Sequence, residues 1–528
     1  MTLPEAVRRQ SGSYYTPDLA ATLMARWVMD RKPATVLEPS FGDGVFLAAV
    51  EQAAASTNQT PELIGVELRQ EAFAQALSAV SSLTLTPRLG DFLGDQPPAV
   101  DAVIGNPPFV RLRNLEAAMR RNATQAADNA LGRPMDPSGS TWMPFVLHAS
   151  EALTPGGCLA LVLPYEITHV RYARPLWRYL GENFGRLRVV RSYNRVFADI
   201  LQDVVVLLAD HKGATTDTIE FQFGQYLTNL EATDNSTRLS LEAVANGDRV
   251  FTRALLSPSV TQLVERLEAE VTVGIEDIAK VRIGYVSGDK RFFHPTAEIV
   301  REFRLPDRSL VPTAGPARHL RGRGLLTSDL ADDALANLWL PDPSRLTKGE
   351  RAYIQYGEGL GVCDAHKCSV RSPWYVVPDV APPDVVFSVF SDTPLVFVND
   401  AGIRISNSHL GAYLHSGWTP QRLAANWYTS VTRLFIETEV HSLGGGVLVA
   451  VPKELGRVRV PTMKLRSRSH LRQLGDALRS TDPHSCFTLG DALLLIQGAL
   501  TVDELSTIYE GLATLQSWRR RDDSLEDV

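Results

Sequence analysis

Apolar and polar positions alternate in two regular ways along the first half of the chain. Short apolar runs of strand length lie at 35–40, 62–68, 83–93, 101–106, 156–164, 187–193 and 202–210. Amphipathic stretches with helical spacing lie at 46–55, 71–80, 145–153 and 173–184. This alternation is typical of parallel strands joined by helical crossovers. We therefore predict an α/β fold with a doubly wound, Rossmann-like and mostly parallel sheet.

Two parts of the chain depart from this alternation. Residues 122–140 are polar and rich in Gly, Pro and Asn, so we expect a mobile loop there. Beyond residue 250, short β-like runs lie among many turns, at 279–289, 373–380, 385–390 and 394–400. We expect two domains, an α/β domain over residues 1–245 and a mixed α+β domain over 246–528 whose C-terminal part is helical.

The composition excludes several classes of protein. With 528 residues, of which 44% are hydrophobic and 21% charged, the chain resembles neither disordered nor fibrous proteins. No apolar run approaches the ~18 residues that cross a bilayer, and the start lacks a signal core, so we expect a cytoplasmic bacterial protein without a membrane partner. The net charge of −7 argues against indiscriminate nucleic-acid binding but permits a local basic cleft.

The cysteines are few and scattered, at Cys158, Cys363, Cys368 and Cys486. They form no disulfide framework, so we expect free thiols. The stretch "CDAHKC" at 363–368 is followed by no second pair of ligands at a supporting spacing. We therefore expect no metal.

Acidic residues follow three successive predicted strands. Glu38 ends the first strand, and Glu67 ends the second, from where a carboxylate can accept both hydroxyls of a ribose. Asp91 and Phe92 follow the third strand, where the acid can accept from an adenine amino group and the ring can pack on the adenine face. Each acid alone fits a helix cap or a solvated turn, but three at successive strand ends predict a nucleoside site.

The turn after the first strand carries Ser40, Gly42 and Gly44. Glycines there let a ligand approach the backbone where a helix begins. The sequence has no G-x-x-x-x-G-K-[ST] motif, and the turn departs from G-x-G-x-x-G, so we expect no phosphate-binding loop. A nucleoside that carries a carboxylate and an amine instead is S-adenosylmethionine. The loop that can cover its methionine end precedes the first strand and contains Tyr15, Thr16 and Pro17.

The fourth strand ends in a rigid turn, "NPPF", at residues 106–109. The Asn106 amide oxygen and the Pro107 carbonyl are two acceptors that suit an NH2 group beside a methyl donor. Hydrogen bonds from both N–H groups favour a pyramidal nitrogen whose lone pair is directed at the methyl group. Phe109 can stack on the ring that carries the amine, and the prolines keep the turn stiff.

Five segments in this order resemble the motifs of the gamma class of N6-adenine DNA methyltransferases from restriction–modification systems: "GSYYTP", "VLEPSFGDG", "GVEL", "GDFL" and "GNPPF". The resemblance covers residues 11–210 and implies a site-specific class I enzyme that converts S-adenosylmethionine to S-adenosylhomocysteine. It also implies that Phe197, in "YNRVFADI", stacks on a flipped adenine. The chain departs from the family pattern with Phe109 in place of the frequent Tyr, and with Ser40 and Phe41 in place of smaller residues.

The second half interleaves basic and aromatic residues, as in "KVRIGYVSGDKRFF" and "KCSVRSPWYVV", and resembles in patches the recognition domains of this class. The expected partner is double-stranded DNA, held through phosphate or flanking-base contacts. Candidate DNA-binding residues are Arg111, Arg113, Lys290, Arg291, Arg321, Arg323, Lys367 and Arg371. The expected protein partner is a separately encoded restriction endonuclease or another defence complex.

Other methyl acceptors stay open. Enzymes acting on RNA adenine or on protein glutamine also use NPP turns, although the domain over 246–528 exceeds what a glutamine methylator needs. Cytosine-N4 methylation also stays open, although enzymes of that group usually place Ser before the prolines. Methylation of cytosine C5 needs a nucleophilic Cys, typically after Pro, and the sequence has no Pro-Cys pair. A fused nuclease is not expected, because no PD…(D/E)-x-K cluster is complete.

Overall fold

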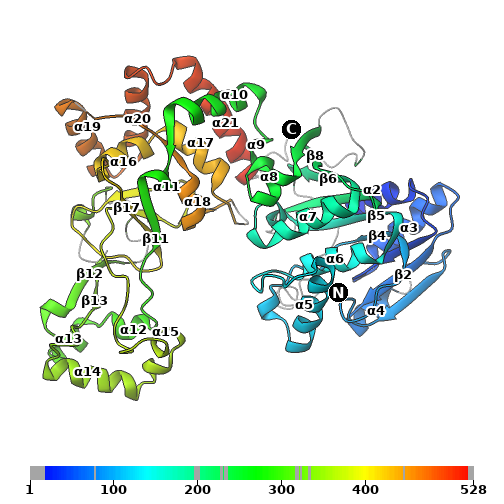
Figure 1. Ribbon diagram of the computed structural model, residues 1–528, viewed down its shortest axis with the longest axis horizontal. Coiled ribbons are helices and arrows are strands. Elements are labelled where there is room, and N and C mark those ends of the chain that lie inside the picture. Colours follow the sequence, from blue (N-terminus) through cyan, green and yellow to red (C-terminus); the bar gives the residue numbers. More distant parts are fainter. Residues whose placement is uncertain are drawn as a thin grey trace. The chain divides into compact units, whose positions relative to one another are not determined.

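The computed structural model describes residues 18–76, 79–194, 203–225, 230, 236–315, 320, 324–330, 335–443, 446–465 and 467–520. These residues fold into two compact units, 18–255 and 256–520 (Figure 1). No helix in the described ranges combines the length and the apolar character needed to span a membrane.

The first unit is built on a nine-stranded sheet with the order β3-β2-β1-β4-β5-β7-β6-β8-β9. Its strands are β1 (Thr35–Glu38), β2 (Glu62–Glu67), β3 (Leu85–Leu89), β4 (Val100–Gly105), β5 (Leu153–Pro164), β6 (Phe184–Ser192), β7 (Val204–Lys212), β8 (Thr218–Gly224) and β9 (Ser236–Ser240). From β3 to β5 all neighbours pair in parallel, β7 runs antiparallel to both β5 and β6, and β9 runs antiparallel to β8. The predicted α/β, doubly wound and mostly parallel sheet is confirmed.

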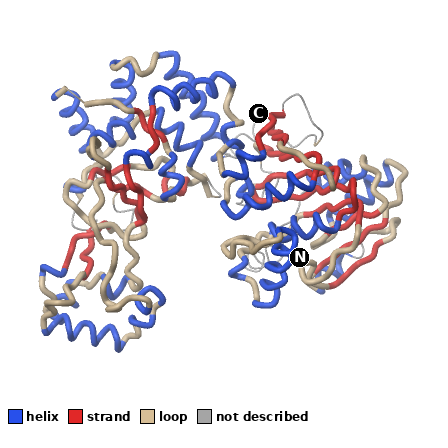
Figure 2. The backbone as a smooth tube through the Cα atoms, viewed as in Figure 1, coloured by secondary structure: helices blue, strands red, loops and turns tan. Residues whose placement is uncertain are grey.

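Helices and strands alternate along this unit (Figure 2). The helices are α2 (Asp18–Met29), α3 (Val45–Ser56), α4 (Gln70–Ala76), α5 (Ala117–Leu131), α6 (Trp142–Ala152), α7 (Arg174–Asn183), α8 (Leu241–Asn246) and α9 (Val250–Arg253). On β5, Cys158 and Ala160 join the core formed with α2 and α3, whereas Leu159 and Leu161, which point to the opposite face, are also fully buried. The sheet is therefore covered on both faces, as parallel sheets require.

The predicted loop over 122–140 is wrong in its first part, because α5 continues to Leu131. Ala123, Ala126 and Ala127 are buried at the i, i+3, i+4 spacing of a helix face. Gly132 then ends the helix in the left-handed region, with φ +62°. The buried face of this helix consists of small alanines that alternate with polar residues. The apolar pattern from which a helix is usually predicted is therefore weak in this segment.

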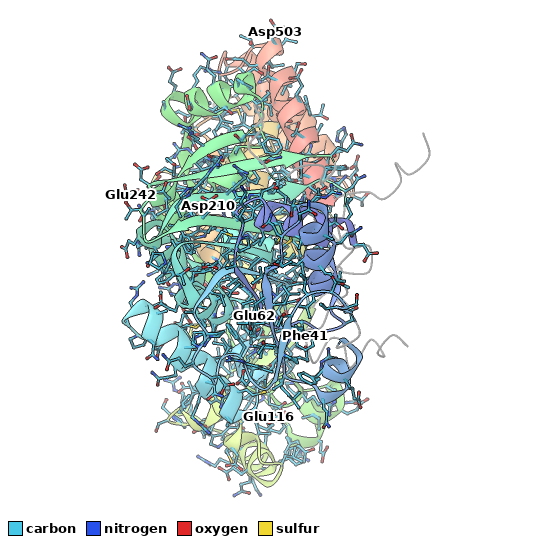
Figure 3. The ribbon with its side chains drawn as sticks, turned by 90° about the vertical axis from the view of Figure 1, so that its right-hand side faces the viewer. Phe41, Glu62, Glu116, Asp210, Glu242 and Asp503 are labelled. Atoms are coloured by element: carbon cyan, nitrogen blue, oxygen red, sulfur yellow. The ribbon has the colours of Figure 1, made fainter. Side chains whose placement is uncertain are left out.

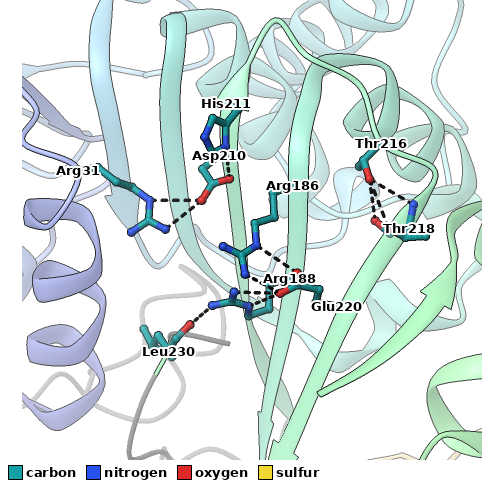
Figure 4. Close-up of polar contacts among 9 residues, drawn as sticks. All are labelled: Arg31, Arg186, Arg188, Asp210, His211, Thr216, Thr218, Glu220 and Leu230. Atoms are coloured by element: carbon teal, nitrogen blue, oxygen red, sulfur yellow. Dashed lines mark hydrogen bonds and ion pairs between the residues drawn. The ribbon is translucent and has the colours of Figure 1, made fainter. Parts of the chain in front are cut away.

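A partly buried ion-pair cluster joins β6 to β8 (Figure 4). Arg188 lies opposite Glu220 in the parallel register, and its guanidinium donates to Glu220 Oε2 at 2.9 Å. Arg186 contacts the same carboxylate at 3.1 Å, and Arg188 also donates to the Leu230 carbonyl. Burial alone would raise the pKa of Glu220, but the two arginines hold that pKa below its usual value. The carboxylate is thus stabilised in its ionised form.

The second unit has mixed α+β character, as expected. Its largest sheet is antiparallel, with the order β11-β17-β14-β16, and three two-stranded sheets accompany it. The strands are β10 (Thr272–Gly274), β11 (Ala279–Ile283), β12 (Leu310–Ala314), β13 (Leu335–Trp339), β14 (Val385–Ser388), β15 (Phe390–Ser391), β16 (Val396–Val398), β17 (His409–Leu414), β18 (Leu448–Val449) and β19 (Arg459–Pro461). The β-like run at 373–380 forms no strand.

Helices dominate the end of the second unit. Its helices are α10 (Pro258–Arg266), α11 (Ile275–Ile278), α12 (Lys290–Phe293), α13 (Ala297–Phe303), α14 (Lys348–Gly359), α15 (His366–Ser369), α16 (Pro420–Trp427), α17 (Ser430–Glu439), α18 (Pro452–Arg457), α19 (Arg468–Arg479), α20 (His484–Ile496) and α21 (Val502–Arg520). A separate aromatic core holds α12 to α14, where Phe292 stacks on Tyr353 with ring centroids 4.5 Å apart. Trp374, from the run expected to be β-like, packs against Phe292 in this core.

We expect Glu220→Gln to lower the free energy of unfolding by about 3 kcal/mol at neutral pH, because it removes the carboxylate that pairs with buried Arg188. Since the folded pKa of Glu220 is lowered, its stabilisation is present above the unfolded pKa and is lost as the pH falls through the folded value. Urea denaturation from pH 7 to pH 3 should therefore show the two proteins converging in acid. The control is Glu242→Gln at an exposed position of α8, expected to change stability by less than about 0.5 kcal/mol. Equal losses would contradict the role of the cluster.

Candidate cofactor and catalytic site

The candidate site lies where the carboxyl ends of three neighbouring parallel strands meet. β2 ends at Glu67, β1 at Glu38, and Asn106 directly follows β4. The Ser40 hydroxyl donates to the Asn106 carbonyl at 3.4 Å, which links the turn after β1 to the turn after β4. A Cβ placed on Gly105 would lie 3.7 Å from Glu38 Cγ. Residues far apart in the sequence thus share one edge of the sheet.

The turn between β1 and α3 depends on two glycines. Gly42 has φ +54° and Gly44, the N-cap of α3, has φ +85°. Both angles lie in the left-handed region, where side chains other than glycine are strained. The Gly42 amide donates to Glu67 Oε2 at 2.9 Å, and a Cβ on Gly42 would meet no atom within 4 Å. The turn therefore leaves open space beside its backbone, as close approach of a ligand requires.

Phe41, one of the departures from the family pattern, is accommodated by a glycine on the next strand. Its ring is 3% exposed and lies against Gly65 of β2, where a Cβ would come within 2.6 Å of the ring. Phe41 is labelled among the side chains of the first unit in Figure 3. Its ring also packs on Phe73 of α4, with centroids 5.8 Å apart. The large side chain points into the core of the first unit, so it leaves the ligand side of the turn free.

Glu38 is an almost fully buried acid with spare hydrogen-bonding capacity. It is 2% exposed, and its Oε2 atom has no hydrogen-bond partner among the described residues. Burial, followed by repulsion from Asp43 and Glu67, raises the pKa of Glu38 well above its usual value. A buried polar atom without a partner is costly, so a ligand donor or cation at this position would be stabilising. This fits the amine and the positively charged sulfur of S-adenosylmethionine.

The other two strand-end acids are only partly occupied by protein donors. Glu67 accepts from the Arg69 amide at 2.8 Å and from its Nε at 3.2 Å, besides the Gly42 amide. Asp91 accepts from the Leu93 amide at 3.1 Å and from Asn122 Nδ2 of α5 at 2.9 Å. A carboxylate offers about four acceptor positions, so each acid retains capacity for a ligand hydroxyl or amine.

Phe92, predicted to pack on adenine, takes part in protein packing. It is 4% exposed, and its ring contacts Phe145 and His148 of α6 at centroid distances of 5.5 and 4.9 Å. Its contact with a ligand stays a prediction. Asn122 was missed by sequence reasoning, because the segment that carries it was expected to be a loop.

The turn after β4 is held by the segment that precedes α6. Pro107 is buried, and Phe109 is partly buried and packs on the core shared with α2 and α3. Arg111 and Ser140 form an antiparallel bridge, and the Leu112 amide donates to the Gly139 carbonyl at 3.1 Å. The NPPF turn is therefore part of a short two-segment pairing and is not an isolated loop.

The arginines that follow the turn differ in their surroundings. The Arg111 guanidinium pairs with Glu166 at 3.0 Å and contacts the Tyr172 hydroxyl at 3.3 Å. Glu166 also accepts from Trp142 Nε1 at 3.0 Å, so this arginine belongs to a polar cluster within the first unit. Arg113 is exposed on the short 3-10 helix η1 (Leu112–Asn114). Contact of either arginine with DNA stays a prediction.

The described basic candidates of the second unit, Lys290, Arg291, Lys367 and Arg371, come from two segments that the structure brings together. Arg371 Nη1 donates to the Ser287 carbonyl at 2.8 Å, and Cys368 Sγ approaches the same oxygen at 3.8 Å, which ties the end of α15 to the loop before α12. Arg371 therefore has a structural role. The exposed candidates on these helices are Lys290, Arg291 and Lys367.

Several predicted site residues lie outside the described ranges: Tyr15, Thr16, Pro17, Phe197, Arg321 and Arg323. Helix α2 is described from Asp18 onward. In the part of the chain that the structure describes, no group of three or more His, Cys, Asp or Glu residues could hold a metal ion.

The sheet and its helices define a class I S-adenosylmethionine-dependent methyltransferase fold. Residues 3–171 match the family model of N-6 DNA methylases, and residues 248–495 match that of the C-terminal domain of the type II methyltransferase M.Eco57I. These matches confirm the resemblance to the gamma-class adenine methyltransferases of restriction–modification systems, and they support a DNA methyltransferase.

Individual relatives match along most of the chain. The sequence is 24% identical to the type II methyltransferase M.PaeR7I of Pseudomonas aeruginosa over 85% of each chain. It is 23% identical to the type II methyltransferase M.AccI of Acinetobacter calcoaceticus, over 76% of this chain and 75% of that one. The type IIL restriction-modification enzyme MmeI, solved in complex with DNA, shares the fold with a TM-score of 0.53 and 11% identity, over 98% of this chain and 77% of that one.

The contact between Phe41 and Gly65 can be tested with a double-mutant cycle. We expect Gly65→Ala alone to lower the free energy of unfolding by about 1–3 kcal/mol, because the new Cβ meets the ring. In a Phe41→Ala background, itself destabilised by about 3 kcal/mol, the same change should cost much less. Urea denaturation measures all four proteins. Gly359→Ala, where a Cβ meets nothing within 4 Å, is the control, and equal costs of Gly65→Ala in both backgrounds would disprove the contact.

Proposed function

We propose that this protein transfers a methyl group from S-adenosylmethionine to the N6 amino group of an adenine flipped out of a specific double-stranded DNA sequence. The observation that carries the proposal is the position of Asn106 and Pro107, in a stiff turn at the strand ends that also carry Glu38 and Glu67. The matches to N-6 DNA methylases support the same reaction. We assign residues 1–245 to methyl transfer and residues 246–528 to target recognition.

The strand-end residues would hold the donor. Glu67 would accept from the ribose hydroxyls and Asp91 from the adenine amino group, while Gly42 and Gly44 let the backbone approach. The buried Glu38 carboxyl would balance positive charge in the pocket once that charge lowers its raised pKa, and its Oε2 atom, which has no partner among the described residues, can accept from a ligand donor. When bound, S-adenosylmethionine supplies an electrophilic methyl group on a positively charged sulfur.

The NPPF turn would hold the acceptor. The Asn106 side-chain oxygen and the Pro107 carbonyl each accept one N–H of the target amine, which draws its lone pair away from the aromatic ring. Phe109, and Phe197 from the family resemblance, would stack on the extruded base. Extrusion costs a few kcal/mol, and each stacking contact returns roughly 1–3 kcal/mol. Two aromatic contacts therefore suffice to offset the loss of the base pair.

The biological role that follows is protection of host DNA from a cognate restriction activity, with a separately encoded endonuclease or defence complex as the partner. The deciding experiment is sequencing of DNA methylated by the purified protein, read for the modified base and its sequence context. N6-methyladenine in one recurring sequence is the expected result. N4-methylcytosine, or methylation of RNA or protein without DNA methylation, would replace this proposal with one of the alternatives.

We expect Asn106→Ala to lower the rate of methyl transfer by at least about 100-fold, because it removes one of the two acceptors that polarise the amine. Binding of S-adenosylmethionine and DNA should change little, since neither the donor acids nor the second unit is altered. Mass spectrometry of methylated DNA and calorimetric donor titration measure the two effects. The matched control is Asn129→Ala on the exposed side of α5. Normal transfer by Asn106→Ala would rule out the amine clamp.

Binding of the cationic donor should release protons from Glu38. Burial raises the pKa of the empty protein's Glu38, and a nearby positive charge lowers it, so between these two pKa values binding expels a proton and affinity rises with pH. Titration calorimetry in two buffers of different ionisation enthalpy counts the protons released. Glu38→Gln should abolish the release, whereas Glu62→Gln, exposed at the opposite end of β2, should preserve it. Equal release by all three proteins would exclude Glu38 as its source.

A further inference from the structure

Thr141 occupies the N-cap of α6 but does not cap that helix. Threonine is a favoured N-cap residue because its hydroxyl accepts from amides of the first turn. Here the residue has helical backbone angles, φ −58° and ψ −32°, and its side chain makes no capping hydrogen bond. The side chain is nevertheless buried, with 3% of the residue exposed. Its hydroxyl serves another part of the fold.

That hydroxyl bridges the two sides of Phe109. It accepts from the Val110 amide at 3.0 Å and donates to the Pro108 carbonyl. These groups belong to the two peptide units that flank Phe109, so one hydroxyl constrains both φ and ψ of this residue. The direction of the aromatic ring depends on those two angles.

Two further hydrogen bonds hold the same segment at the carbonyl group of Val110. The Val110 carbonyl accepts from the Thr141 amide at 2.8 Å and from Ser140 Oγ at 3.0 Å. Pro107 and Pro108 have no N–H and cannot donate hydrogen bonds of their own. Other groups therefore add to the orientation of the turn, and the Thr141 side chain reaches the peptide units on both sides of Phe109.

We infer that Thr141 is a positioning residue for amino-group methyl transfer, one that fixes the Phe109 backbone and thereby aligns the target base with the acceptors of the NPPF turn. The inference rests on the proposed function. Its effect is exerted through Phe109, and the Thr141 hydroxyl itself is engaged by backbone groups. Loss of the hydroxyl should therefore disturb base placement and leave the donor pocket intact.

The first unit offers a matched control in Thr35. Its hydroxyl also accepts from a backbone amide, that of Asp101 at 2.9 Å, and donates to an oxygen, Asp101 Oδ2 at 3.2 Å. This pair of bonds joins β1 to β4 at their amino ends, whereas Thr141 acts just beyond the carboxyl end of β4. Thr35→Val and Thr141→Val thus remove the same kind of interaction at opposite ends of one strand.

The experiment compares full-length wild type, Thr141→Val, Thr141→Ser and Thr35→Val on a duplex that carries the target sequence read from the methylation products of the wild type. We expect Thr141→Val to slow single-turnover transfer roughly 10- to 100-fold, with unchanged donor affinity, because a small misplacement of the reacting groups has effects of this size. Thr141→Ser, which keeps the hydroxyl, should restore most of the rate. Thr35→Val should transfer at the wild-type rate even where its thermal stability falls.

A second measurement separates base placement from stability. A duplex with 2-aminopurine at the target position reports unstacking by its fluorescence, and Thr141→Val should alter this signal while Thr35→Val and Thr141→Ser do not. Thr141→Cys, a weak hydrogen-bonding variant of small size, replaces Thr141→Val in both measurements if valine prevents folding.

Two outcomes would overturn the inference alone. One is a wild-type rate and fluorescence for the variant without the hydroxyl, with Asn106→Ala inactive. The other is an equal loss for Thr141→Val and Thr35→Val, which would show a purely structural role. Absence of DNA methylation by the wild-type protein would overturn the proposed function, and the inference with it.

Discussion

The site depends on the parallel pairing of β1 with β2 on one side and with β4 on the other. Parallel neighbours present their carboxyl ends at the same edge of a sheet, so residues that follow these strands are forced into proximity. Glu38, Glu67 and Asn106 owe their common location to this single constraint. The β1–β2 register pairs Glu38 with Gly65, whose missing side chain in turn makes room for the Phe41 ring. Strand pairing thus sets both the polar and the apolar parts of the site.

Two acids of the first unit, Glu220 and Glu38, differ in their surroundings, and the difference distinguishes a structural acid from a candidate binding residue. Glu220 is neutralised by Arg186 and Arg188 and is held ionised, as expected for an ion pair within a fold. Glu38 is more deeply buried than Glu220 and faces further acids, Asp43 and Glu67, and its Oε2 atom has no partner among the described residues. Such an arrangement is unfavourable unless a positive charge or a donor group binds beside it, and perturbed acids of this kind concentrate at binding sites.

In the second unit, aromatic side chains form the core, and basic side chains on the same helices lie at the surface. Aromatic rings of α12 and α14 form a core of their own, which places Lys290 and Arg291 at the surface of a rigid element. Arg371 instead donates a hydrogen bond to the Ser287 carbonyl and so holds the backbone there. Lys290 and Arg291 are therefore accessible to a ligand, whereas the Arg371 guanidinium already binds a backbone carbonyl. The sequence around these residues does not reveal this difference, because the carbonyl lies far from Arg371 along the chain.

The sequence by itself determined the α/β class, the strand ends and the candidate donor residues, because strand and helix periodicity and the residues that follow each strand are local properties. It failed over 122–131, where small alanines bury a helix face without a strong apolar pattern. Only the tertiary structure decided that Asn122 reaches Asp91, that Arg111 pairs with Glu166, and that the Thr141 hydroxyl holds the peptide units around Phe109. These contacts join segments that are distant in the chain, and their partners are selected by packing in three dimensions, which leaves no periodic signal in the order of the residues.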